Sequence, residues 1–223
     1  GLDNSIDIAV LDDGYQNWDI KRDLDIICLN FNSPFGNGFL IPGGSLREEV
    51  SALKRADIIL INKTLSVDNF YYFETVKKYN QSAEIIFTRY RIEDLQDIAR
   101  GVQVDQNSTK GIASAFVTAV ADPDYVRVML NQLGVSIKNE FIYPDHHIFS
   151  RKDISYVAAK VSSEVKMLFF TEKDYVKFSG DLEFFKQAFN GKILVLVKIG
   201  LDYLSNEKAL YRRLDILLDS PLC

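Results

Sequence analysis

The sequence predicts an α/β protein with a mainly parallel sheet flanked by helices, and it leaves room for a second, smaller lobe. Apolar runs of strand length recur along the chain, and several are polar on neither face, which is typical of strands covered on both sides. Segments with helical spacing of apolar residues lie between these runs. Strand, helix and strand in alternation indicate parallel pairing with right-handed crossovers.

The expected strands, in order along the chain, are Ile6–Leu11, Leu24–Leu29, Ile58–Ile61, Glu84–Thr88, Ile112–Val120, Phe141–Tyr143, Met167–Thr171 and Ile193–Val197. The expected helices are Leu46–Arg55, Val67–Tyr79, Asp122–Leu133, Lys152–Val165 and Glu207–Leu218. Asp122-Pro123-Asp124 indicates a helix start, because proline suits the first turn of a helix.

Two stretches interrupt this alternation. From Asn32 to Ser45 the chain holds several glycines and prolines without periodicity, and a loop of this length inside a compact domain usually has a function. From Gly101 to Gly111 polar residues dominate, which indicates a linker between two lobes. We therefore divide the chain into residues 1–100, with the Asp-Asp strand end and the Gly/Pro-rich loop, and residues 111–223.

Composition narrows the classes of function. A formal charge of -5 and a pI of about 5.1 provide no general basic face, so nucleic acid is not expected as a partner. The two cysteines, Cys28 and Cys223, form neither a disulfide framework nor a metal-ligand pattern, which fits a reducing cytosol. No apolar stretch is long enough to cross a bilayer, so we expect any membrane contact to be peripheral. The start at Gly1, with methionine only at internal positions, is what we expect of a chain cut from a longer one.

The first motif is an apolar strand that ends in Asp12, Asp13 and Gly14. In nucleotide-binding α/β proteins, a carboxylate at the carboxyl end of a strand lies where the ligand binds and can hold Mg²⁺ directly or through water. The alternative is an ordinary acidic turn after a strand, which the residues alone leave open.

The second motif, Asp145-His146-His147, contains both histidines of the chain. Histidine titrates near neutral pH, so it can accept a hydroxyl proton, and a carboxylate such as Asp13 could orient it if the fold brings strand ends together. A surface turn capped by polar residues is equally compatible with the residues.

The third motif is the exit of the Gly/Pro-rich loop. Arg47 falls at the start of an expected helix, where a guanidinium and free backbone N–H groups can hold an anion such as phosphate. Ser45 and Glu48 have capping-box spacing, which explains them without a ligand, while Arg47 could be a solvated surface charge. The fourth motif, Thr171-Glu172-Lys173-Asp174, is expected as a helix N-cap with acidic residues in its first turn.

Together these motifs resemble one family, the tetraacyldisaccharide 4'-kinases of lipid A biosynthesis. The strings that carry the resemblance are Leu11-Asp12-Asp13-Gly14-Tyr15-Gln16, Arg22-Asp23-Leu24-Asp25-Ile26, Pro34-Phe35-Gly36-Asn37-Gly38, Leu46-Arg47-Glu48, Leu53-Lys54-Arg55-Ala56-Asp57, Phe87-Thr88-Arg89-Tyr90, Pro144-Asp145-His146-His147 and Thr171-Glu172-Lys173-Asp174-Tyr175-Val176-Lys177. The departures from the family pattern are Asn17, where histidine is usual, Gly43, Ser45 and Glu49 at the loop exit, and Phe170, where threonine is common.

The resemblance implies a P-loop NTPase-like fold and transfer of the γ-phosphoryl group of ATP to the 4'-hydroxyl of a tetraacylated glucosamine disaccharide 1-phosphate, which yields lipid IVA. It implies Mg²⁺ at Asp12, nucleotide contacts at Asp12 and Asp13, and a catalytic pair of Asp13 with His146. Residues implied in substrate binding are Arg47, Glu48, Gln16 and Asn37. Because the acceptor is a lipid, the enzyme is expected at the cytoplasmic face of the bacterial inner membrane.

In this family the phosphate loop lies upstream of the Asp-Asp strand, together with a membrane-associating helix, and the present sequence contains no Gly-x-x-x-x-Gly-Lys-Ser/Thr string. The chain by itself is therefore expected to be inactive, although soluble. Two other functions stay open: another P-loop small-molecule kinase or ligase, and a non-catalytic α/β binding module. A panel of hydroxyl acceptors would identify the first, and the reading frame upstream would identify the second.

Overall fold

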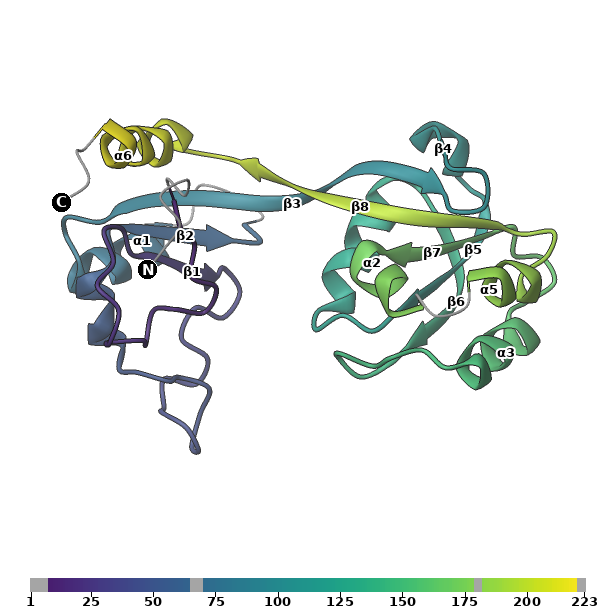
Figure 1. The fold of residues 1–223 in the computed structure, drawn as a ribbon, viewed down its shortest axis with the longest axis horizontal. Helices are drawn as coiled ribbons and strands as arrows, with labels where there is room; N and C mark the ends of the chain where they lie inside the picture. Colours follow the sequence, from purple (N-terminus) through teal and green to yellow (C-terminus); the bar gives the residue numbers. More distant parts are fainter. Residues whose placement is uncertain (1–7, 65–69, 179–181, 220–223) are drawn as a thin grey trace. The chain divides into compact units, whose positions relative to one another are not determined.

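The computed structural model describes residues 8–64, 70–178 and 182–219. The chain forms two compact units: unit 1 comprises residues 1–90 and 201–223, and unit 2 comprises residues 91–200. Two paired strands, β3 (Glu84–Asp97) and β8 (Ile193–Tyr203), each contribute residues to both units (Figure 1). The prediction of a mixed α/β protein with a mostly parallel sheet is confirmed.

Unit 1 is built on three parallel strands. β1 (Ile26–Asn30) pairs with β2 (Ile58–Asn62), which pairs with the first part of β3. The other elements of this unit are the 3₁₀ helix η1 (Val50–Arg55), α1 (Phe70–Tyr79) and α6 (Glu207–Asp219). Its buried core contains Leu29, Phe31, Leu53, Ala56, Ile59, Ile61, Val76, Ala83, Ile85 and Phe87. The buried amide of Asn80 fastens this core, because its Nδ2 donates to the carbonyls of Leu53 and Ala56, both at 2.8 Å.

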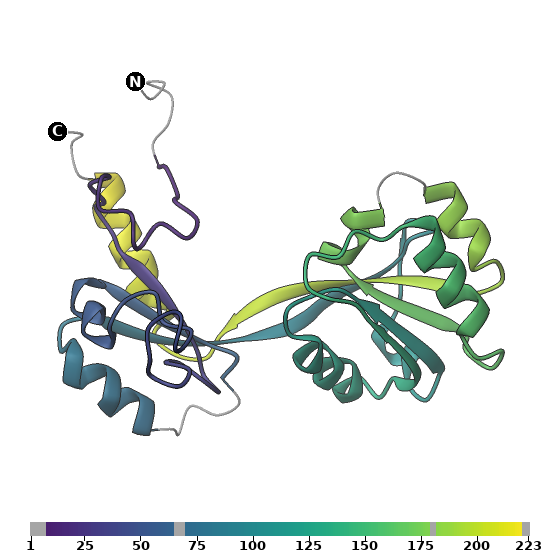
Figure 2. The ribbon, with the colours of Figure 1, turned by 90° about the horizontal axis from the view of Figure 1, so that it is seen from below.

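Unit 2 is a parallel sheet in the order β8, β7 (Met167–Thr171), β5 (Ala113–Thr118), β6 (Ser136–Ile142), with β3 antiparallel to the short β4 (Val102–Gln103). The connecting elements are η2 (Gln106–Thr109), α2 (Pro123–Gln132), α3 (Arg151–Lys160), α4 (Glu172–Tyr175), η3 (Val176–Phe178) and α5 (Leu182–Ala188). α3 and α5 cover one face of this sheet and α2 the other (Figure 2). Every residue of β7 is buried, as the apolar sequence Met167–Thr171 predicts for a strand covered on both faces.

Side-chain caps start three of the helices in unit 2. Asp122 accepts from the backbone N–H of Tyr125 at the start of α2, and Pro123 occupies its first turn, as predicted. Thr171 caps α4 in a capping box with Asp174, which confirms the predicted N-cap. Ser150 caps α3 in a second capping box with Asp153.

Several expected elements of unit 1 are wrong or incomplete. Ile8–Leu11 form no strand, and Ile8, Val10 and Leu11 are exposed; residues 6 and 7 of that expected strand lie outside the described residues. A strand is stable only with a hydrogen-bonded neighbour, and no strand among the described residues pairs with this run. The expected helix Val67–Tyr79 is found as α1 from Phe70 onward, and residues 67–69 lie outside the described residues.

The helix expected at Leu46–Arg55 is reduced to η1, and the capping box expected for Ser45 and Glu48 does not form. Leu46 lies in an isolated bridge with Leu40 and not in a helix, and its N–H donates to the carbonyl of Phe39 at 3.2 Å. The residue at the N-cap of η1 is Glu49, without a side-chain cap.

The polar stretch Gly101–Gly111, which the sequence suggests as a linker, lies inside unit 2. It begins with the turn between β3 and β4 and contains η2, where Thr109 is fully buried. The chain passes between the units at Tyr90–Arg91 and again at Gly200–Leu201.

Candidate functional site

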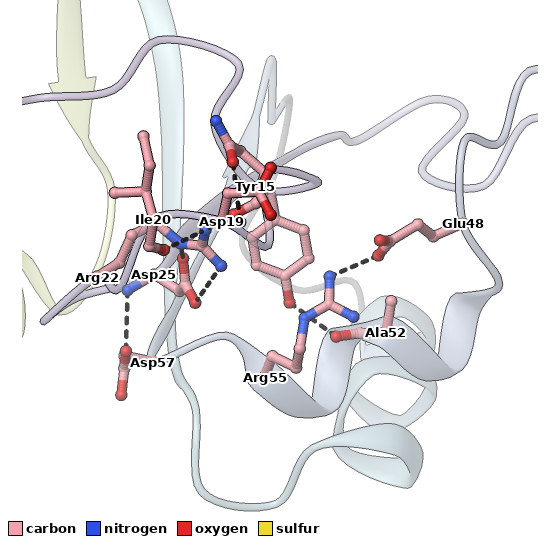
Figure 3. Close-up of polar contacts among 10 residues, drawn as sticks. Tyr15, Asp19, Ile20, Arg22, Asp25, Glu48, Ala52, Arg55 and Asp57 are labelled. Carbon is pink, nitrogen blue, oxygen red and sulfur yellow. Dashed lines mark hydrogen bonds and ion pairs between the residues drawn. The ribbon is translucent and has the colours of Figure 1, made fainter.

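The segment that follows the Asp-Asp pair is fixed to η1 by the Arg55 cluster, which consists of Tyr15, Trp18, Glu48, Ala52 and Arg55. The Tyr15 hydroxyl donates to the Ala52 carbonyl at 2.7 Å. The Arg55 guanidinium lies 4.5 Å from the centre of the Tyr15 ring and 4.2 Å from that of the Trp18 ring. Its Nη2 donates to Glu48 Oε2 at 2.5 Å (Figure 3). Burial raises the pKa of Tyr15, and nearby Arg55 partly opposes this.

A second set of contacts ties the same segment to the start of β2. Arg22 Nε donates to Asp25 Oδ1 at 2.6 Å, and Arg22 Nη1 reaches the carbonyl of Asn17. The Asp25 N–H donates to Asp57 Oδ2 at 2.9 Å (Figure 3). The Asp57 N–H donates to the Asp25 carbonyl, also at 2.9 Å. Residues 15–25 are therefore held at both ends, although they contain no helix or strand.

Asp13 and Arg47, two predicted site residues, meet in unit 1. Arg47 Nη1 donates to Asp13 Oδ2 at 2.5 Å, and the two side chains are 56% and 64% exposed. This contact raises the pKa of Arg47. Because both side chains are exposed, solvent screens this ion pair, so a phosphate or a metal ion can compete for either partner. Asp12 is exposed beside it.

The other predicted substrate residues of unit 1 have structural contacts of their own. Glu48 is half-buried and bonded to Arg55. Asn37 spans its loop, since its Nδ2 donates to the Gly43 carbonyl at 2.9 Å and its Oδ1 accepts from the Phe39 N–H. Gln16 is half-buried next to Tyr15. Asp13 and Arg47 thus lie together, while Glu48 and Asn37 stabilise the segments around them.

The two histidines of unit 2 have different surroundings. His146 has a side chain that is 92% exposed and a backbone φ of 63°, and its Nε2 lies 3.4 Å from Asp145 Oδ2. His147 stacks on the Tyr143 ring at 4.7 Å, and its Nε2 lies 3.2 Å from Asp153 Oδ2. His146 is therefore free to meet a ligand, while His147 holds the turn against the protein.

Sequence reasoning missed Asp153 as the partner of His147. Burial raises the pKa of Asp153. The hydrogen bonds from Ser150 and His147 together lower that pKa by more, so its net shift is downward. The spacing of Ser150 and Asp153 is that of a capping box and immediately follows the histidines, so it could have indicated this contact.

Asp174, from the fourth predicted motif, is a buried carboxylate with four hydrogen bonds. Its Oδ2 accepts from the hydroxyls of Thr118 at 2.8 Å and Thr171 at 2.7 Å and from the Thr171 N–H, and its Oδ1 accepts from the Ala119 N–H at 2.8 Å. The Tyr143 N–H donates to the Thr118 carbonyl at 2.9 Å. Asp174 therefore joins the ends of β5 and β7, and through Thr118 it supports the strand that leads to the histidines.

Replacing Arg55 by alanine is expected to lower the free energy of unfolding by about 1–2 kcal/mol, since both ring contacts and the ion pair are lost. Urea unfolding measures this change in free energy. Trp18, the chain's single tryptophan, belongs to the cluster, so its fluorescence reports the unfolding of that region. Lys54→Ala, an exposed neighbour on η1, is the matched control and should stay within about 0.5 kcal/mol of the parent. Equal losses in the two variants would contradict the importance of the cluster.

Among residues 8–64, 70–178 and 182–219, no group of three acidic, histidine or cysteine side chains is arranged to hold a metal ion. Within the same ranges, no helix is both long and apolar enough to cross a bilayer.

Comparison with known proteins gives a consistent picture. The model of the family described as tetraacyldisaccharide-1-P 4'-kinase (LpxK) matches residues 2–219. A tetraacyldisaccharide 4'-kinase of Elusimicrobium minutum is 32% identical over 174 residues, which cover 77% of this chain and 46% of the relative. One of Syntrophobacter fumaroxidans is 27% identical over 217 residues, which cover 94% of this chain and 53% of the relative. The chain thus spans about half the length of the curated relatives it matches.

The fold has a counterpart among solved structures. A crystal structure of LpxK from Aquifex aeolicus in complex with ATP superposes with a TM-score of 0.59 at 19% identity, covering 92% of this chain and 56% of the other. At that identity the likeness concerns the fold alone.

Proposed function

The chain belongs to the tetraacyldisaccharide-1-P 4'-kinase family, and on that premise we propose that it serves ATP-dependent transfer of a phosphoryl group to the 4'-hydroxyl of a tetraacylated glucosamine disaccharide 1-phosphate. The product is lipid IVA, an intermediate of lipid A. The observation that carries this proposal is the contact of Asp13 with Arg47, which joins an acidic segment to the exit of a Gly/Pro-rich loop. Phosphoryl transfer needs mainly positioning and neutralisation of charge, and exposed carboxylates beside a guanidinium suit both.

Arg47 is proposed to bind a phosphate group, with Gln16 and Asn37 in the same acceptor region. Its guanidinium can exchange the Asp13 carboxylate for a phosphate, because both are bound through the same N–H groups. Glu48 is proposed to act there by positioning, since its carboxylate is already bonded to Arg55.

Asp12 and Asp13 fit a magnesium site. Mg²⁺ is usually held by one or two carboxylates together with substrate phosphates and water, so a pair of exposed carboxylates is a sufficient protein contribution. Bound Mg²⁺ would neutralise charge on the phosphates of ATP. Asp12 is the proposed metal ligand. Asp13 is proposed to contact the nucleotide and to neutralise the charge of Arg47.

Asp13 and His146 are proposed as the groups that assist removal of the proton from the 4'-hydroxyl. The His146 imidazole is exposed and can accept a proton as a general base, and a carboxylate would stabilise its protonated form. The two residues belong to different units, and their pairing is inferred from the family resemblance.

Because the proposed acceptor carries acyl chains, we further propose that the protein works peripherally at the cytoplasmic face of the inner membrane. The test of the function is transfer of labelled phosphate from ATP by the full-length protein. The acceptors compared would be the tetraacylated disaccharide 1-phosphate, its deacylated form and a panel of small hydroxyl compounds. Transfer to the acylated disaccharide is expected; transfer to small metabolites alone would instead identify a different kinase.

A further inference from the structure

The Gly/Pro-rich loop of unit 1 presents three consecutive apolar side chains to solvent. Phe39, Leu40 and Ile41 are 65%, 44% and 63% exposed. They lie in the long loop between β1 and η1, which extends away from the strands of unit 1 (Figure 1). Exposed apolar residues scattered singly are ordinary, but a contiguous group in one loop, here Phe39–Ile41 and called the tip, indicates a contact surface.

The loop carries no charge. No Asp, Glu, Lys, Arg or His occurs from Phe31 to Leu46, in a chain of which 26% is charged. A surface that meets only water or a polar partner has no reason to avoid charge over this length. A surface that enters a hydrocarbon layer does have to avoid charge, because transfer of a charged side chain from water into hydrocarbon costs free energy.

The backbone of the tip is also largely satisfied within the loop. The N–H groups of Ile41 and Gly44 donate to the carbonyls of Leu46 and Leu40, both at 2.9 Å. The N–H groups of Gly38, Phe39 and Leu46 have partners inside the loop as well, and Pro42 has no N–H. Backbone groups that are already paired lose little when water is removed, which is the condition for entering lipid.

The tip is held in place at both ends. Phe35 packs against the core of unit 1, and Arg47 contacts Asp13. At Gly44 an added Cβ would collide with the side-chain oxygen of Asn37 and the carbonyl of Phe39, so the turn is closely packed. Among the described residues, the exposed apolar run Ile8–Leu11 shows no backbone hydrogen bonds of the kind seen in this loop.

We propose that Phe39, Leu40 and Ile41 insert into the acyl-chain layer of a bilayer and make a peripheral membrane contact. The choice of lipid as the occupant rests on the proposed function, because a kinase with a lipid acceptor has to meet that acceptor at a bilayer. Insertion there would bring Arg47, six residues after Ile41, toward the headgroup layer, where the phosphates of lipids lie.

The first test is flotation of this chain with vesicles of phosphatidylethanolamine and phosphatidylglycerol, without ATP or acceptor. The double variant Phe39→Ser with Ile41→Ser is expected to lower the partition coefficient about tenfold or more. The matched control, Val102→Ser with Val128→Ser, removes exposed apolar side chains of unit 2 and should partition like the parent. Equal partition of parent and tip variant would overturn the proposal.

A second test places a reporter at the tip. In Phe39→Trp, emission beyond that of Trp18 should shift to the blue on addition of vesicles and resist quenching by acrylamide. An unshifted emission would overturn the proposal. The proposal would also be overturned if sedimentation showed that the tip variants abolish self-association of the chain and leave vesicle binding intact. Neither readout needs turnover, so an inactive kinase that binds vesicles through its tip would refute only the proposed function.

Discussion

Alanine at Asp13 or at His146 in the full-length protein is expected to lower kcat for lipid phosphorylation by about a hundredfold or more, the usual scale for a general acid–base group. His146 is exposed and makes few contacts, so its removal should leave folding intact. The measurement is the initial rate of phosphate transfer at saturating ATP and acceptor, with circular dichroism to check the fold.

Two controls separate catalysis from positioning. Asp19→Ala removes an exposed carboxylate from the same segment and should leave kcat near that of the parent. Arg47→Ala breaks the contact with Asp13 and should mainly raise KM for the acceptor, because it removes binding and not proton transfer. If Asp13 and His146 act as one unit, the double variant is no slower than the worse single one. Multiplying losses, or near-normal turnover in either single variant, would refute the pair.

Asp174→Ala is expected to lower the free energy of unfolding of unit 2 by on the order of 3–5 kcal/mol. The carboxylate is fully buried, and its loss leaves four buried donors without an acceptor, among them the Thr171 N–H that completes the capping box of α4. Hydrogen exchange at the amides of β5 and β7 measures this locally, and urea unfolding measures it for the chain.

Glu172→Ala is the matched control, because Glu172 lies on the same short helix and is exposed. It should change stability by no more than about 0.5 kcal/mol. Asp174→Asn should fall between the two, since it keeps one acceptor oxygen and turns the other into a donor. Similar hydrogen-exchange protection of β5 and β7 in all three variants would show that the Asp174 carboxylate does not stabilise the contact between these strands.

The elements predicted best from the sequence are those with an apolar environment on every side. Met167–Thr171 is a strand with the expected limits, because a short apolar run of this kind favours a strand that is buried on both faces. The expected helix at Leu46–Arg55 did not form in full because contacts with the preceding loop and with Arg55 decided the conformation of its first half. Leu46 pairs with Phe39 and Ile41, and Glu48 binds Arg55, neither of which is visible in local periodicity.

The candidate site was predicted by residue type and not by pairing. Asp13 and Arg47 were selected separately, for metal or proton chemistry and for anion binding, and their contact across 34 residues could not be read from spacing. Asp174 was expected only as part of a helix start. Its second role, at the end of β5, depends on the order of strands in the sheet.

The order in which the chain is synthesised gives the two units different folding histories. All residues of unit 2 lie between Arg91 and Gly200, so they have been translated before the last part of unit 1 exists. In unit 1, the Phe87 N–H donates to the Ser205 hydroxyl and the Leu204 N–H to the Phe87 carbonyl, contacts that close across more than a hundred residues. Nascent unit 1 must therefore wait for the segment that carries Leu204 and Ser205. A ribosome that stalls near Gly200 would release a chain in which unit 1 lacks these contacts and is open to chaperones and proteases.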